Sequence, residues 1–427
     1  MEEKSNYPIW HPYTQMQTAD FPIEITSAKG ANLYAADGRV FIDAISSWWT
    51  NIHGHAHPYI AQKIAEQAAN LEQVIFAGFT HRPAVDLANR LLEKLPYHHK
   101  VFYSDNGSTA VEAALKMALQ FWSNKGTPHT KIIAFSDAYH GDTFGSMSVS
   151  ARSVFNAPYS RLLFDVEFID APYPGNEQKS VAQLQQVLHE NKHEIAAFIF
   201  EPLVLGSAGM KMYAASALDD LLHCCKAEKI ITIADEVFTG FGRTGTFMAM
   251  EQCSTKPDIT CLSKGITGGF MPFAATLCMQ EIYDAFLSDK KAKMLLHGHS
   301  YTGNPLGCAA ALASLDLFAQ EQTMQKVAQI TIWHKAFYEK IKPHKSVLHI
   351  RQTGTILAIE LRSDAPSGYL NQISHSVTPF FLEKGILIRP LGNVIYILPP
   401  YCITDADLNQ VYEAVELFLE SLRTSNN

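Results

Sequence analysis

Four short apolar runs in the middle of the chain predict buried strands. They are residues 100–103, 131–135, 196–200 and 230–234, and polar or glycine-bearing residues follow each of them. Because the runs are continuously apolar rather than alternating, we expect strands that are covered on both faces, as in a mostly parallel sheet between layers of helices. The pattern therefore predicts an α/β fold, in which ligands bind at the carboxyl ends of the strands.

The two ends of the chain show a different pattern. Near the start, short strand-like pieces at residues 32–35 and 41–43 flank Asp37-Gly38, which is a turn signal. Toward the end, helical patterns lead to apolar runs at residues 354–360 and 394–398, and a further helical pattern follows. The patterns at both ends thus predict short strands and helices that do not belong to the central sheet.

The length of the chain favours more than one domain. It has 427 residues, whereas single hydrophobic cores usually stop growing at roughly 250–300 residues. We predict a large domain over residues 51–308 and a smaller α+β domain built from residues 1–50 and 309–427.

The composition is that of an ordinary globular protein. Hydrophobic residues make up 47% and charged residues 18%, and the net charge of −8 predicts no overall attraction to nucleic acid or to an anionic membrane. No apolar stretch reaches the roughly 18 residues of a membrane span, and the opening segment lacks the apolar core of a signal peptide, so a cytoplasmic location is expected. Seven cysteines without a C-x-x-C pair argue against a disulfide framework and a zinc site.

A carboxylate and a lysine, each next to an apolar segment, give the first chemical signal. Asp235 ends the run at residues 230–234, and Lys264 follows Cys261-Leu262. Burial lowers the pKa of a lysine so that it can form a Schiff base, and a carboxylate favours the protonated form of a pyridine nitrogen. Pyridoxal phosphate requires both groups. The alternative, a strand-end cap and a solvated lysine, is favoured for either residue taken alone.

Two further segments follow predicted strands. In residues 105–114, Gly107 and Ser108 open an alanine-rich helix whose free N–H groups suit a phosphate, although an ordinary helix cap is the alternative. Tyr139 follows the run at residues 131–135 and is placed to stack on a cofactor ring, unless it is a core tyrosine.

Two other segments give weaker signals. Residues 240–245 match the dinucleotide pattern G-x-G-x-x-G, but no long helix follows, so we interpret them as an active-site loop. In this loop, Arg243 pairs either with Glu201 or with a ligand carboxylate, or is purely structural. The histidines of residues 53–57 would share a face in a strand, yet no cysteine or carboxylate lies near in sequence, which argues against a metal site.

Together the motifs resemble those of the class III pyridoxal-phosphate-dependent aminotransferases. The resemblance rests on Asp235-Glu236-Val237, on Gly240-Phe241-Gly242-Arg243 with Gly245, and on Ser263-Lys264-Gly265, and it covers nearly the whole chain. It implies the type I fold of pyridoxal-phosphate-dependent transferases, with a seven-stranded-type sheet in the large domain. It also implies a homodimer with active sites at the subunit interface.

The resemblance implies roles for individual residues. Gly107 and Ser108 bind the cofactor phosphate, Tyr139 stacks on the ring, Asp235 contacts its nitrogen, Lys264 forms the Schiff base and Ser300 reaches the phosphate of the partner subunit. Lys264, Tyr139 and Asp235 are thereby the expected catalytic residues.

Four segments resemble family members that aminate 8-amino-7-oxononanoate in biotin synthesis, with S-adenosylmethionine as donor. They are Trp10-His11-Pro12-Tyr13-Thr14-Gln15, Ser46-Ser47-Trp48-Trp49, Tyr139-His140-Gly141-Asp142-Thr143-Phe144-Gly145 and Ile388-Arg389-Pro390-Leu391-Gly392. A long aliphatic ketone with a terminal carboxylate requires an apolar trough and a cation. The residues implied for substrate binding are Tyr13, Trp48, Asp142, Gly298 and Arg389. Trp49 is expected to pack in the core, because neighbours in a strand face opposite sides.

Several alternatives stay open. Residues 298–302 read Gly-His-Ser-Tyr-Thr where S-adenosylmethionine-using members carry Gly-Pro-Thr-Phe-Met, so lysine is an alternative donor. Another ω-amino acid or diamine aminotransferase is a second alternative. A ligand-sensing protein without catalysis and a dehydrogenase that uses residues 240–245 are alternatives from other classes.

Overall fold

A seven-stranded sheet forms the centre of the protein, whose computed structural model describes residues 7–191, 193–363, 371 and 373–424. The strand order is β4-β12-β11-β10-β7-β5-β6, and within this sheet β12 runs antiparallel to both of its neighbours. The strands are β4 (Lys100–Ser104), β5 (Lys131–Phe135), β6 (Val166–Ile169), β7 (Ile195–Phe200), β10 (Ile231–Asp235), β11 (Ile259–Leu262) and β12 (Ala274–Cys278). The four predicted runs are β4, β5, β7 and β10, which confirms the α/β fold, whereas β6, β11 and β12 were not predicted from the apolar pattern.

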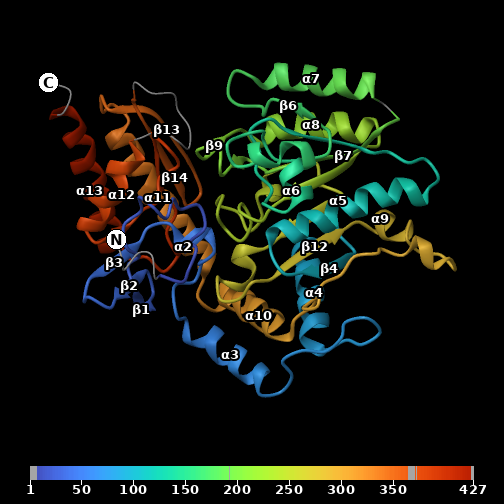
Figure 1. The fold of residues 1–427 in the computed structure, drawn as a ribbon, viewed down its shortest axis with the longest axis horizontal. Coiled ribbons are helices and arrows are strands. Elements are labelled where there is room, and N and C mark those ends of the chain that lie inside the picture. Colours follow the sequence, from blue (N-terminus) through green and yellow to red (C-terminus); the bar gives the residue numbers. More distant parts are fainter. Residues whose placement is uncertain (1–6, 192, 364–370, 372, 425–427) are drawn as a thin grey trace.

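Helices cover both faces of this sheet (Figure 1). On one face, α5 (Gly107–Asn124) packs against Ala197 and Ile199 of β7. On the other face, Phe198 and Phe200 of the same strand pack in a cluster with the leucines of α7 (Glu177–Glu190) and α8 (Ala215–Ala227). Since successive side chains of a strand point to opposite faces, burial on both faces explains the continuously apolar runs.

A smaller unit contains both ends of the described chain (Figure 1). In its first sheet, β1 (Ile25–Lys29), β2 (Asn32–Ala35) and β3 (Val40–Asp43) are joined by β15 (Ile386–Leu387), which pairs parallel with β3. Its second sheet consists of β13 (Val347–Thr353), β14 (Ile356–Leu361) and β16 (Val394–Ile397). Three helices belong to this unit: α11 (Thr323–Ile341), α12 (Ser374–Glu383) and α13 (Asp405–Thr424).

The boundary predicted after residue 308 falls inside a helix. α10 (Pro305–Gln320) packs on α3 (Pro58–Ala68) and α4 (Arg82–Lys94), whereas α11 packs on β13 and β14. Gln322, with a φ of 52°, separates α10 from α11. The domain boundaries themselves stay a prediction. The remaining short elements are α2 (Ser46–Trp49), α6 (Phe144–Ser148), η1 (Ala157–Leu162), β8 (Val204–Leu205), β9 (Lys211–Met212), η2 (Ala249–Gln252), η3 (Lys264–Thr267), α9 (Gln280–Asp284) and η4 (Lys291–Lys293).

The segment with the two tryptophans is not a strand, so the strand-based reason for separating Trp48 from Trp49 is wrong. Asp43 ends β3, and its carboxylate accepts the backbone N–H groups of Ile45 and Ser47 at 3.1 and 2.6 Å. These bonds turn the chain into the distorted helical turn α2. Trp48 is nevertheless exposed and Trp49 buried.

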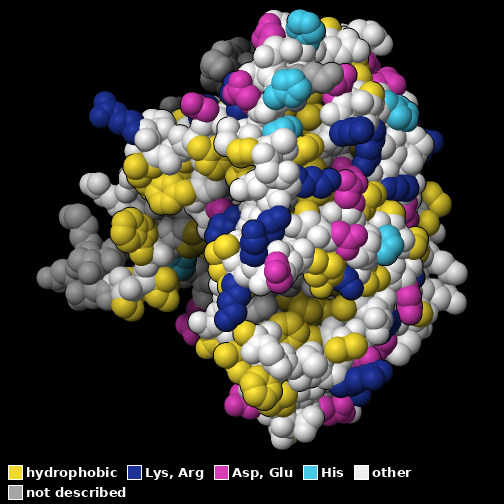
Figure 2. Space-filling view, turned by 90° about the vertical axis from the view of Figure 1, so that its right-hand side faces the viewer, with side chains coloured by type: hydrophobic (Ala, Val, Ile, Leu, Met, Phe, Trp, Pro, Cys, Tyr) yellow, Lys and Arg dark blue, Asp and Glu magenta, His cyan; other side chains and the backbone are white. Residues whose placement is uncertain are grey.

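The surface agrees with the modest net charge. On the face shown in Figure 2, Lys and Arg side chains are interspersed with Asp and Glu, so this face presents no large field of one sign. Within the described ranges, no helix combines the length and the apolar character that crossing a bilayer requires.

Candidate functional site

Lys264 is held in an unusual backbone conformation directly after β11. It begins the single turn η3 with a φ of 45°, a region that costs a non-glycine residue about 1–3 kcal/mol. The hydroxyl of Ser263 donates to the carbonyl oxygen of Phe273 at 2.8 Å and fixes the preceding residue. Nζ of Lys264 lies 4.8 Å from the ring centroid of Trp49 and 5.6 Å from that of Phe238. Burial lowers the pKa of Lys264 to about 8, although the negative charges of Asp235 and Glu201 oppose this shift.

A cavity of about 590 Å³ collects the candidate residues of the central sheet at its carboxyl edge. Lys264 and Asp235 line this same cavity, together with residues that follow β4, β5 and β7. The strand-end residues that line it are Asp105, Asn106, Gly107, Ser108, Tyr139, His140, Gly141, Asp142, Thr143, Glu201, Asp235, Ser263 and Lys264. Parallel strands bring residues from distant parts of the chain to one edge, as the α/β pattern predicts.

Asp235 has a partner that sequence reasoning missed. Nδ1 of the buried His140 lies 2.7 Å from Oδ2 of Asp235, and the carboxylate can only accept, so Nδ1 carries the hydrogen. The other carboxylate oxygen accepts the N–H of Val237 at 3.1 Å. Nε2 of His140 is buried and has no partner among the described residues. The sequence does contain one feature that points to His140, because it follows Tyr139 in the segment after β5.

The start of α5 offers two free N–H groups to the cavity. The side chain of Asn106 caps the helix by accepting the N–H of Thr109 at 3.1 Å, so the alternative of a helix cap is present. The cap leaves the N–H groups of Gly107 and Ser108 without an acceptor inside the helix. A Cβ atom on Gly107 would lie 2.7 Å from Cγ1 of Val237, so this position needs glycine. The cradle fits a phosphate at a helix N-terminus.

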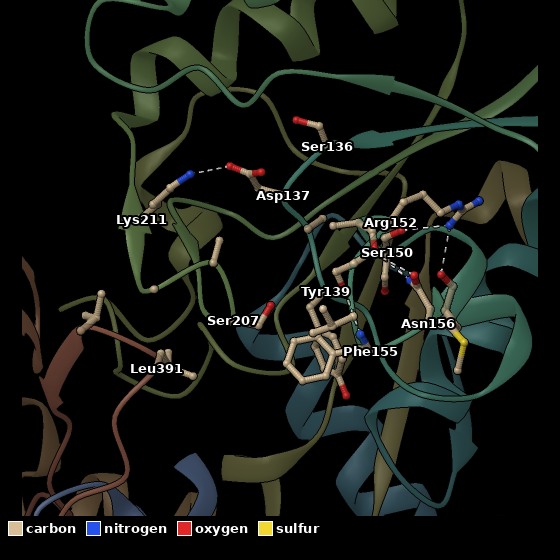
Figure 3. A pocket seen from close by; sticks show the side chains of 18 of the residues that line it. Ser136, Asp137, Tyr139, Ser150, Arg152, Phe155, Asn156, Ser207, Lys211 and Leu391 are labelled. Atoms are coloured by element: carbon tan, nitrogen blue, oxygen red, sulfur yellow. Dashed lines mark hydrogen bonds and ion pairs between the residues drawn. The ribbon is translucent and has the colours of Figure 1, made fainter. Parts of the chain in front are cut away.

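Tyr139 lies between this cavity and a second one. Its N–H donates at 2.9 Å to Glu201, whose pKa burial raises to about 7. Its hydroxyl lies 3.3 Å from that of Tyr13. The second cavity, of about 750 Å³, has Tyr139 and Phe155 on one side and the ion pair between Lys211 and Asp137 on another (Figure 3).

The structure brings four of the predicted substrate residues together beside Tyr139. The hydroxyl of Tyr13 donates to the carboxylate of Asp142. The ring of Tyr13 lies 5.6 Å from that of Trp48, and the guanidinium of Arg389 lies 4.8 Å from the Trp48 ring. Aromatic surface and one cation thus lie next to Tyr139 and Asp142, which line both cavities.

Gly298 and Ser300 do not line this cavity. They lie on an exposed segment, and the carbonyl oxygen of Ser300 accepts the side-chain amide of Gln73 at 2.8 Å. Their assignments stay predictions, and they require a second subunit.

Arg243 is structural, which was one of its predicted alternatives. Its buried guanidinium donates to the carbonyl oxygens of Trp49, Asn51 and Pro399 at 3.3, 3.1 and 3.1 Å. The side chain therefore ties the glycine-rich loop to the smaller unit, and it does not pair with Glu201.

The histidines of residues 53–57 do not converge. His53 bonds to the hydroxyl of Ser314 at 3.1 Å, and His55 and His57 bond to Asp43 and Glu321, each at 2.8 Å. Each imidazole therefore has a separate protein partner.

The lowered pKa of Lys264 predicts how the apoprotein reacts with an aldehyde. Because the free amine is the reactive form, the rate of modification of Lys264 by pyridoxal should rise about tenfold from pH 7 to pH 9 and then level off. Borohydride trapping and peptide mass spectrometry measure this rate. A rate that continues to climb through pH 10 would indicate an ordinary, solvated lysine.

Known proteins resemble this chain over nearly its whole length. A family model described as Aminotransferase class-III matches residues 13–419. A curated relative from Synechococcus elongatus, named adenosylmethionine-8-amino-7-oxononanoate aminotransferase, is 48% identical over 97% of this chain and 99% of its own. The solved structure of the enzyme of that name from Methanocaldococcus jannaschii has a TM-score of 0.91 and 36% identity, with 97% of each chain covered. An amine transaminase from an uncultivated Pseudomonas species, in the PLP-bound (internal aldimine) form, has a TM-score of 0.90 and 31% identity, with 96% of this chain and 98% of its own covered.

Proposed function

Since the chain belongs to the class III aminotransferases, we propose that it uses pyridoxal phosphate to transfer an amino group from S-adenosylmethionine to 8-amino-7-oxononanoate, giving 7,8-diaminononanoate for biotin synthesis. The observation that carries this proposal is the shared cavity of Lys264 and Asp235, with Tyr13, Trp48 and Arg389 grouped beside its lining residues Tyr139 and Asp142. The names of the relatives in Synechococcus elongatus and Methanocaldococcus jannaschii support the choice of substrates.

The residues of the cavity fit the cofactor. Pyridoxal phosphate supplies an aldehyde that accepts the amino group and a ring that withdraws electrons from the substrate carbon. The N–H groups of Gly107 and Ser108 would bind its phosphate, and the ring of Tyr139 lines the same cavity. Asp235, oriented by His140, would favour a proton on the ring nitrogen.

Lys264 moves the proton of the reaction. With a pKa of about 8, its Nζ loses its proton more readily than an ordinary lysine does. Once the donor amine has displaced Nζ from the aldehyde carbon, the free amine would accept the proton of the substrate carbon that bears the amino group. The aromatic rings of Trp49 and Phe238 keep water away from Nζ, which favours the uncharged amine over the ammonium.

The side chains of Trp48, Tyr13 and Arg389 suit the acceptor ketone. Trp48 and Tyr13 offer apolar faces to an aliphatic chain, and the guanidinium of Arg389 offers a cation to its terminal carboxylate. The carbonyl oxygen of Tyr13 accepts a hydrogen bond from Arg389 at 3.4 Å, which links the aromatic and cationic parts.

We propose a homodimer in which Ser300 and Gly298 serve the partner's site. Ile75, Phe79, Leu296 and Tyr301 are each more than 60% exposed, which is unusual for large apolar side chains. Their two segments are joined, since Nε2 of His81 lies 2.6 Å from the carbonyl oxygen of Gly303. A subunit interface would bury this surface. The seven free cysteines also fit a reducing compartment, and we propose the cytoplasm.

A half-reaction scan tests the donor. The protein is reconstituted with pyridoxal phosphate, and its visible absorption band is followed after separate additions of S-adenosylmethionine and of lysine. Loss of the band with S-adenosylmethionine is expected. Loss with lysine alone would select the alternative donor, which the Gly-His-Ser-Tyr-Thr sequence of residues 298–302 favours. Loss with neither, but with other ω-amino acids, would overturn the substrate assignment.

The same assay tests the acceptor through Arg389→Ala. Removal of a charged hydrogen-bonding partner costs about 1.5–3 kcal/mol, so the KM for 8-amino-7-oxononanoate should rise roughly 10- to 100-fold. The donor half-reaction should change little. Arg39→Ala is the matched control, because Arg39 pairs with Asp37 in the distant β2–β3 turn. An unchanged KM in Arg389→Ala would mean that this ketone is not bound through Arg389.

A further inference from the structure

Four side chains form a continuous hydrogen-bonded chain at the rim of the cavity. Nζ of Lys116 lies 3.1 Å from Nδ1 of His297, and Nε2 of His297 lies 3.2 Å from Nε2 of His299. Nδ1 of His299 then lies 2.8 Å from Oδ2 of Asp105, which lines the cavity. The chain thus runs from an exposed ammonium to a carboxylate two residues before α5.

The chemistry of the two ends fixes the direction of every bond. An ammonium only donates, so Nδ1 of His297 accepts and its Nε2 carries the hydrogen. A carboxylate only accepts, so Nδ1 of His299 carries a hydrogen and its Nε2 accepts from His297. Both imidazoles satisfy this arrangement in the neutral form, each with one defined tautomer.

These hydrogen bonds connect the segment that carries Ser300 to α5. Asp105 precedes this helix and Lys116 lies within it, whereas His297 and His299 belong to the segment that carries Ser300. The N–H of His299 also donates to the hydroxyl of Thr302 at 2.9 Å. The position of Ser300 is therefore tied to the same helix start that offers Gly107 and Ser108 to the cavity.

We propose that His299, relayed through His297 to Lys116, is a positioning residue that holds the segment of Ser300 in register with the phosphate cradle. This inference rests on the proposed function, because Ser300 matters only if two subunits share a phosphate site. His299 is not among the residues that line the cavity of Lys264. Its removal should therefore weaken cofactor binding by changing the position of the segment that carries Ser300.

Protonation of either imidazole disrupts this series of hydrogen bonds. On His299 a second hydrogen would face the hydrogen that already lies between the two Nε2 atoms, and on His297 it would lie on Nδ1 and face the ammonium of Lys116. Burial and the charges of Lys116 and His299 lower the pKa of His297, whereas Glu112 raises it. The groups that face the chain are thus Lys116, Glu112 and Asp105, with the ring of Phe102 stacked 5.9 Å from His297. Because its pKa is lowered, His297 keeps its neutral form in mild acid, and this arrangement of hydrogen bonds should persist there.

Two variants of His299 test whether its hydrogen bond to Asp105 is what matters for cofactor binding. In His299→Ala the dissociation constant for pyridoxal phosphate, measured by absorbance titration of the apoprotein, should rise about tenfold. In His299→Asn the side-chain amide occupies the place of Nδ1 and can donate to Asp105, so the rise should stay within about threefold.

Hydrogen exchange of the apoprotein gives a reading that does not depend on the cofactor. Amides of residues 297–303 should exchange several-fold faster in His299→Ala than in the wild type. Equal exchange and equal affinity in His299→Ala would overturn the inference, as would an alanine-like loss in His299→Asn. Failure of the wild-type protein to bind pyridoxal phosphate would instead overturn the proposed function, while the exchange comparison would still decide the role of His299.

Discussion

Lys264→Ala should lower turnover by about 10⁴-fold or more and should abolish the visible absorption band of the bound cofactor. The substitution removes two functions at once, the covalent attachment of the cofactor and the transfer of the proton at the substrate carbon. Nζ lies beside the rings of Trp49 and Phe238, and water in that place would be a much weaker base. Steady-state turnover with donor and ketone, together with the spectrum of the reconstituted protein, measures both effects.

Lys211→Ala is the matched control for this variant. Lys211 lines the neighbouring cavity and pairs with Asp137 at 2.7 Å, so it is also a lysine near the site (Figure 3). It is expected to keep the absorption band and most of the turnover. Full activity in Lys264→Ala would remove the basis of the proposed chemistry, and loss of the band in Lys211→Ala would reassign the attachment site.

The pair of Lys264 and Asp235 was predictable because its signals are local. Each residue follows a continuously apolar run, and strands of a parallel sheet end at one edge, so strand-end residues converge without knowledge of the strand order. The helix start at Gly107 was predictable for the same reason, since small residues after β4 reveal it in the sequence. Its capping by Asn106 and its phosphate cradle are compatible, because they use different N–H groups.

Contacts between distant strands were not predictable. His140 and Asp235 are 95 residues apart, and they meet because β5 and β10 are separated in the sheet by β7 alone. The apolar pattern contains no information on strand order. Likewise, the contact between His299 and Asp105 joins residues 194 positions apart. The burial of Arg243 depends on carbonyl groups of the smaller unit, which no local pattern reveals.

Asp235→Asn should lower turnover by about 10²–10⁴-fold, which corresponds to the roughly 3–5 kcal/mol lost when one partner of a buried charge pair is removed. The carboxamide keeps the shape of the side chain, and its oxygen can still accept from Nδ1 of His140. It carries no charge, however, and no longer stabilises a proton on the ring nitrogen. Affinity for the cofactor should therefore change much less than turnover, because Lys264 and the start of α5 are unaltered.

Two matched variants test whether charge is the cause. His140→Asn keeps Asp235 but removes the imidazole that orients it at 2.7 Å, and it should lower turnover only about tenfold. Glu236→Gln alters the adjacent carboxyl, which accepts the N–H groups of Ala249 and Met250 and the hydroxyl of Thr239 instead of lining the cavity. That variant should lower stability and leave turnover per folded molecule nearly unchanged. Equal turnover in Asp235→Asn and Glu236→Gln would show that the charge at Asp235 does not act on the cofactor ring, because the two variants remove neighbouring carboxylates that differ in whether they face the cavity.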